Sequence, residues 1–150
     1  MSKFRPIEDY LPHRPPMLLI DELVDVTDIK AVVRTTIKPD CIFARDGIVH
    51  PAAMIEFMAQ CCAILIGARP SGKGPRLGFI ISCREVNLLV DSFSVGDKLE
   101  LTAGKVHGQD ALAVFSCTVS RDGVQCATMQ LSAVDAEVIG TQPVAETVDR

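Results

Sequence analysis

Residues 51–68 read PAAMIEFMAQCCAILIGA, and this stretch decides the fold. Pro51 suits the first position of a helix, where its missing N–H would be unpaired in any case, and Gly67 marks the exit. Between them, Glu56 and Gln60 are the only strongly polar side chains. A helix that is apolar on almost every side either spans a membrane or is enclosed by protein.

The surroundings of this helix favour the enclosed alternative. The run is at the short limit for a membrane span, and it carries a carboxylate and an amide. Strand patterns, rich in β-branched residues and bounded by turn pairs, precede and follow it. They cover residues 17–26 and 31–37 before the helix, and residues 77–90, 98–106, 111–120 and 124–134 after it.

One apolar helix among six strands needs a sheet that curls around it. We therefore predict an α+β chain with the hotdog fold, in which a curved antiparallel sheet wraps one long central helix. Residues 1–150 form a single domain, with a frayed tail from about residue 137. Two such sheets commonly pair edge to edge, so we expect a homodimer or a higher oligomer of dimers.

Composition excludes several classes of function. The net charge is −4 with both signs mixed, which argues against nucleic-acid binding. No apolar run follows the first basic residues, so a secretory signal is not expected. The six cysteines lack CxxC spacing, which argues against zinc and favours reduced thiols in a cytoplasmic protein. We expect neither a metal nor a cofactor.

Two motifs carry a family likeness. Residues 10–21 read YLPHRPPMLLID and residues 55–60 read IEFMAQ, with weaker echoes at residues 78–80 and 95–99. These resemble the signatures of the hotdog 3-hydroxyacyl-ACP dehydratases, and the likeness covers residues 6–135. The resemblance implies chemistry on acyl thioesters carried by acyl carrier protein or by coenzyme A.

The sequence also departs from that family. The family has a catalytic His in the loop before the helix, at the position that Ile42 occupies here. It has Gly where this chain has Pro51, and Pro offers no N–H to an oxyanion. The chain thus resembles a divergent branch, like the dehydratase-like proteins found with aryl-polyene-type lipid synthesis genes.

Dehydration of a 3-hydroxyacyl thioester needs a base for the α-proton and an acid for the departing hydroxyl. Glu56 is the candidate acid, because an apolar setting favours a neutral carboxyl. His50, at the expected N-cap, is either the base or a surface residue. Gln60 lies at i+4 from Glu56 and either holds the carboxyl or contacts substrate. His13 has no acidic partner nearby in sequence, and we expect a structural, hydrogen-bonded imidazole.

The remaining candidates serve substrate and carrier. Developing charge on the thioester oxygen needs backbone donors, which we assign to Ala52 and Ala53 with help from Gly78. Apolar tunnel walls are expected from Met54, Phe57, Met58 and Cys61. A basic rim for acyl carrier protein or the phosphates of coenzyme A, or else a solvated loop, is expected from Arg69, Lys73, Arg76 and Arg84.

Three functions remain open at this stage. The first is a 3-hydroxyacyl-ACP dehydratase in fatty-acid or related lipid or polyene synthesis. The second is a hotdog thioesterase in which Glu56 activates water or attacks the acyl carbon. The third is a non-catalytic subunit that holds acyl chains or pairs with an active relative, and the missing loop His favours it.

Overall fold

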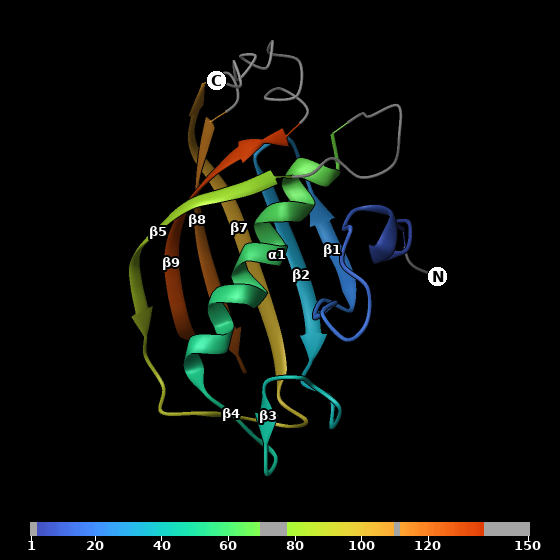
Figure 1. The fold of residues 1–150 in the computed structure, drawn as a ribbon, viewed down its shortest axis with the longest axis vertical. Helices are drawn as coiled ribbons and strands as arrows, with labels where there is room; N and C mark the ends of the chain where they lie inside the picture. Colours follow the sequence, from blue (N-terminus) through green and yellow to red (C-terminus); the bar gives the residue numbers. More distant parts are fainter. Residues whose placement is uncertain (1–2, 70–77, 110–111, 137–150) are drawn as a thin grey trace, which may run out of the picture.

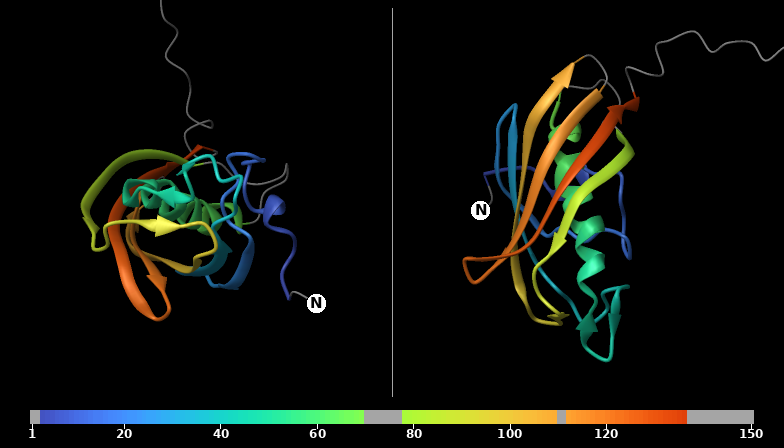
Figure 2. Two further views of the ribbon diagram at one scale, coloured as in Figure 1. Left: turned by 90° about the horizontal axis from the view of Figure 1, so that it is seen from below. Right: turned by 90° about the vertical axis from the view of Figure 1, so that its left-hand side faces the viewer.

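The computed structural model describes residues 3–69, 78–109 and 112–136. A six-stranded antiparallel sheet, in the order β1-β2-β7-β8-β9-β5, curls around the helix α1 (Figures 1 and 2), which is the predicted α+β hotdog arrangement. Its strands are β1 (Glu22–Val26), β2 (Lys30–Thr36), β5 (Gly78–Leu88), β7 (Lys98–Gln109), β8 (Leu112–Arg121) and β9 (Val124–Asp135).

Smaller elements lie at the two ends of the helix. A three-stranded sheet of β3 (Ala44–Arg45), β4 (Ile48–Val49) and β6 (Phe93–Ser94) lies near the start of α1, as Figure 1 shows. One 3-10 turn, η1 (Ile7–Asp9), lies in the N-terminal segment, and a second, η2 (Pro51–Ala53), leads directly into α1 (Met54–Gly67). The tail from residue 137 lies outside the described residues.

The sheet of a single chain already covers most of α1. Eleven of its fourteen residues are buried, and only Ile55, Glu56 and Ala63 are half-buried. Glu56 and Ala63 are seven residues apart, which is about two helical turns, and Ile55 adjoins Glu56. The three residues therefore form a single stripe along the helix. The curved sheet and the N-terminal segment of one chain therefore cover most of this apolar helix without a second subunit.

Residues 17–21 are not part of a strand, contrary to the predicted strand over residues 17–26. The N–H groups of Met17 and Leu18 both bond to the carbonyl of Arg14, which turns the chain after Pro15–Pro16. The first backbone bond to β2 is made by the Asp21 N–H, which donates to the Arg34 carbonyl at 3.3 Å, and the strand itself begins at Glu22. The β-branched pattern was read correctly, but local turn chemistry shortened the strand by five residues.

Two hairpin turns are formed by Asp-Gly pairs whose backbone has positive φ, a conformation that these two residue types tolerate. Asp122 and Gly123 join β8 to β9 with φ values of 53° and 76°, as predicted from the Asp-Gly pair. Asp46 and Gly47 have nearly the same values, 52° and 78°, and join β3 to β4. That hairpin was missed, although its signal is the same dipeptide.

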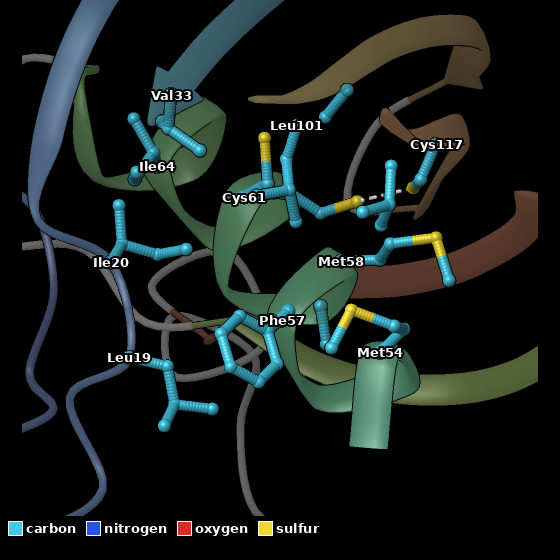
Figure 3. Close-up of a cluster of buried hydrophobic side chains, with 14 of the residues drawn as sticks. Leu19, Ile20, Val33, Met54, Phe57, Met58, Cys61, Ile64, Leu101 and Cys117 are labelled. Atoms are coloured by element: carbon cyan, nitrogen blue, oxygen red, sulfur yellow. Dashed lines mark hydrogen bonds between the residues drawn. The ribbon is translucent and has the colours of Figure 1, made fainter. Parts of the chain in front are cut away.

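The core lies between α1 and the concave face of the sheet. Figure 3 shows side chains of α1 reaching toward Val33 of β2 and Leu101 of β7. All six cysteines are free, and four of them are buried, as expected. Burial raises the pKa of the Cys61 thiol, so it stays protonated as a small apolar group.

The close approach of Tyr10 to Gly67 leads to a testable prediction about how the N-terminal segment packs against α1. A Cβ at this position would collide with the backbone carbonyl of Tyr10. We expect Gly67→Ala to lower the free energy of unfolding by about 1–3 kcal/mol, measured by urea denaturation. Gly104→Ala is the matched control, because its Cβ would meet nothing closer than 4.0 Å. Equal stability of the two variants would contradict this packing.

Candidate functional site

Glu56 stands on the open stripe of α1, in the first turn of the helix. Its side chain is 31% exposed, so it is not the deeply buried carboxyl that the sequence suggested. Ile55 and Ala63 flank it on the same stripe. A molecule that lies along this stripe would therefore meet one carboxyl in an otherwise apolar surface.

Gln60 fixes the position of that carboxyl. The Gln60 side-chain amide donates to Glu56 Oε1 at 2.9 Å and to the Met17 carbonyl at 2.7 Å. Its own Oε1 accepts the Leu19 N–H at 3.0 Å. Because Gln60 is only 1% exposed and its amide is fully used, it is a support for Glu56, and the alternative of direct substrate contact is not favoured.

Two buried side chains form hydrogen bonds with the backbone of the irregular segment before β1, as a neighbouring strand would do in a sheet. Gln60 takes the N–H of Leu19, and the Thr35 hydroxyl donates to the Leu19 carbonyl at 2.6 Å. Thr35 and Gln60 are two of the three buried polar residues within the described part of the chain. Buried polar groups need partners, so these bonds hold residues 17–19 against α1 and β2.

This docking brings His13 to Glu56. His13 Nε2 lies 3.8 Å from Glu56 Oε1, and the two side chains are 28% and 31% exposed. We expected His13 to have no acidic partner and to make a structural hydrogen bond, and both expectations are wrong. His13 Nδ1 is buried and has no hydrogen-bond partner within the described residues.

His50 has a different place. It is exposed and forms the N-cap of η2, where its Nδ1 accepts the Ala52 N–H at 3.0 Å. The predicted N-cap position is confirmed. The predicted pairing with Glu56 is not found within one chain, where His13 occupies that place instead.

The proposed oxyanion donors are occupied or distant. The Ala52 N–H goes to the His50 ring, and the Ala53 N–H goes to the His50 carbonyl at 3.0 Å. Gly78 packs against Ile66, which lies ~15 Å further along the helix axis than Glu56. Within one chain these three residues therefore do not form the expected oxyanion site.

A groove of about 440 Å³ lies between the N-terminal segment, β2 and α1, and neither Glu56 nor His13 lines it. Its walls include Pro15, Pro16 and Leu18 from the segment that carries His13, and Phe57 from the turn that carries Glu56. Of the four walls predicted on the helix, Phe57 alone lines this groove. The others are 0% exposed and belong to the core (Figure 3): Met54, Met58 and Cys61.

A larger hollow of about 600 Å³ lies over β1, β2 and β7. Its lining is mostly charged or hydroxylic, and neither Glu56 nor His13 lines it. Neither hollow contains the pair, but more of the residues that line the smaller groove are apolar, and one of them, Phe57, follows Glu56 in the sequence. We therefore associate the smaller groove with the site.

The predicted basic rim is not assembled in the described part of the chain. Arg69 lies at the far end of α1, where its guanidinium is 3.5 Å from the Asp135 carboxylate. Arg84 is exposed on β5. Lys73 and Arg76 lie outside the described residues.

Other kinds of site find little support in the described residues. They contain no group of three or more His, Cys, Asp or Glu side chains placed to hold a metal ion. None of the described helices is long and apolar enough to cross a membrane.

Known proteins resemble this chain along most of its length. The family model described as "ApeP-like: ApeP dehydratase" matches residues 5–143. The 3-hydroxyacyl-[acyl-carrier-protein] dehydratase FabZ of Acinetobacter baumannii is 29% identical over 132 residues, covering 83% of this chain and 90% of the relative. FabZ of Streptococcus pneumoniae serotype 4 is 28% identical over 137 residues, covering 88% and 96%.

Solved structures agree on the fold. The dehydratase heterocomplex ApeI:P of Xenorhabdus doucetiae matches with a TM-score of 0.79 and 24% identity, covering 92% of this chain and 97% of the matched chain. A hypothetical thioesterase of Streptococcus pneumoniae with coenzyme A matches with a TM-score of 0.61 and 14% identity, covering 76% and 84%. Both likenesses are to the hotdog architecture described above.

The hydrogen bonds of Gln60 make a prediction about stability. We expect Gln60→Met to lower the free energy of unfolding by about 2 kcal/mol or more, because it leaves the buried Leu19 N–H without a partner. Chemical denaturation monitored by circular dichroism measures this loss. Gln125→Met, at an exposed position on β9, is the control and should change stability by no more than about 0.5 kcal/mol. A similar loss in both variants would contradict the support role of Gln60.

Proposed function

Because this chain belongs to the ApeP-like dehydratase family, we propose that it removes water from a 3-hydroxyacyl thioester to give an enoyl thioester. The observation that carries the proposal is the Glu56 carboxyl, held by Gln60 on the single open stripe of an apolar helix. Glu56 acts as the acid that protonates the departing hydroxyl.

The acyl chain lies in the groove lined by Leu18, Phe57 and their neighbours. Apolar walls suit a hydrocarbon chain, and the groove is shaped by the same two segments that place the carboxyl.

The carrier of the acyl group is acyl carrier protein rather than coenzyme A. The FabZ relatives are named for acyl-carrier-protein substrates, and exposed Arg84 on β5 offers a positive contact for an acidic carrier. The six free cysteines support a cytoplasmic setting for the reaction.

A second function, that of a non-catalytic partner subunit, is favoured by one observation. The N–H groups of Ala52 and Ala53 at the helix start are already bonded to His50, so they do not serve a thioester oxygen within one chain. The two functions differ in turnover, because a partner subunit alone would bind acyl thioesters without converting them.

Glu56→Gln tests the dehydratase proposal. The amide matches the carboxyl in shape but has no acidic proton, so we expect normal folding and a kcat lower by about 10²–10⁴-fold. Formation of the enoyl thioester from a 3-hydroxyacyl thioester of acyl carrier protein is followed by ultraviolet absorbance. Glu22→Gln, exposed on β1, is the control and should retain full activity. Unchanged turnover in Glu56→Gln would remove Glu56 from the mechanism.

The protein also has a surface for a second subunit. The edge strand β5 carries Phe79, Ile80 and Ile81, which are 58%, 51% and 59% exposed. An apolar strand with an unpaired edge is a template for another strand. We propose that two chains join their β5 edges into a dimer.

Ile81→Lys tests this dimer. We expect the native chain to sediment as a dimer at micromolar concentration and Ile81→Lys to shift it toward monomer, because the charge would be buried between two edges. Val106→Lys, on β7 at 60% exposure, is the matched control and should remain dimeric. A native chain that sediments as a monomer would contradict the proposal.

A further inference from the structure

His13 is the imidazole that the structure places beside the carboxyl. It lies in the segment between η1 and β1, and its Nε2 is 3.8 Å from Glu56 Oε1. The Arg14 guanidinium donates to the Leu11 and His13 carbonyls at 2.8 Å and 2.7 Å, and these bonds fix the local turn. The two side chains therefore border the same partly open space and can serve one bound molecule.

The nitrogens of His13 are not used for structure. Nδ1 is buried without a hydrogen-bond partner within the described residues, and the 3.8 Å to Glu56 is too long for a hydrogen bond. A partly buried imidazole kept for packing would normally satisfy its nitrogens. His50 is the opposite case, because its Nδ1 is engaged by the Ala52 N–H. Nδ1 is enclosed, so Nε2, which faces Glu56 and makes no hydrogen bond to it, is the His13 nitrogen that a ligand can reach.

We propose that His13, and not His50, is the general base of the dehydration, acting with Glu56 of the same chain. This inference rests on the dehydratase function proposed above. It also accounts for the absence of a His at the position of Ile42, because His13 in the N-terminal segment supplies the imidazole instead.

The proposed step balances as follows. His13 Nε2 takes the α-proton, and the electron pair of that C–H bond forms the double bond between the α- and β-carbons. The bond between the β-carbon and oxygen breaks, and Glu56 gives its proton to the oxygen, which leaves as water. The imidazolium and carboxylate left behind are neighbours, so the proton returns from His13 to Glu56 after a small side-chain rotation and restores both groups.

Adjacent acid and base also constrain the substrate. Both reactive atoms lie on one side of the site, so the α-proton and the β-hydroxyl must leave from the same face of the acyl chain.

Three histidine variants test the inference in the full-length protein. His13→Gln should lower kcat by about 10²–10⁴-fold with little change in KM, because it removes the base and leaves the groove intact. His50→Asn keeps a side chain that can cap η2 but removes the imidazole, and we expect less than a threefold loss. His107→Gln, exposed on β7, should match the native protein. Turnover is measured with a 3-hydroxyacyl thioester of acyl carrier protein.

A rescue experiment separates chemistry from folding. His13→Ala leaves a space beside Glu56, and added imidazole should restore part of its turnover, whereas a purely structural loss would not respond. Full activity in His13→Gln, or a large loss of kcat confined to His50→Asn, would overturn the inference and leave the dehydratase proposal intact. A native protein without turnover would overturn the proposed function, and this inference with it.

Discussion

The buried amide of Gln60 is the interaction on which the candidate site depends. An amide in an apolar core is costly unless all its groups are bonded, and here Met17, Leu19 and Glu56 take them. The same side chain therefore anchors the N-terminal segment and aims the carboxyl. Together with the bond from Thr35 to the Leu19 carbonyl, this anchor holds residues 17–19 against α1 and β2 and so keeps His13 near Glu56.

The curved sheet imposes the second constraint, and it acts on the helix. Since the sheet and the N-terminal segment together bury eleven of the fourteen residues of α1, only one stripe remains for chemistry. Glu56 lies on that stripe. The helix residues one turn away from it are apolar except for Gln60, whose side chain is already hydrogen-bonded. The open stripe of α1 thus carries a single charged group, Glu56, and the N-terminal segment adds His13 beside it.

Much of the fold was predictable because its signals are local. The apolar run between Pro51 and Gly67 predicted the helix, and the Asp122–Gly123 pair predicted a hairpin that the structure confirms. The strand expected at residues 17–21 does not form because the chain turns locally after Pro15–Pro16 and because tertiary contacts then hold it. There, Gln60 and Thr35, distant in sequence, satisfy the backbone groups of Leu19 that a neighbouring strand would otherwise bond.

The site was predictable only in the part that lies within one helix. Glu56 and Gln60 are four residues apart, so their contact follows from helical geometry. His13 comes close to Glu56 because a separate segment packs against α1. The spacing of residues within one helix or strand cannot predict such a contact. Two signals pointed to it: the motif at residues 10–21 contains His13, and a buried Gln60 needs partners from outside its helix.

The pairing of His13 with Glu56 in one chain is the central claim, and a crystal structure with bound substrate tests it most directly. The Glu56→Gln protein, which should bind but not convert, is crystallised with a 3-hydroxyacyl thioester. The account predicts the α-carbon about 3.5 Å from His13 Nε2 of the same chain, with the β-hydroxyl at residue 56. An α-carbon that faces His50, or any residue of a second subunit, would contradict it.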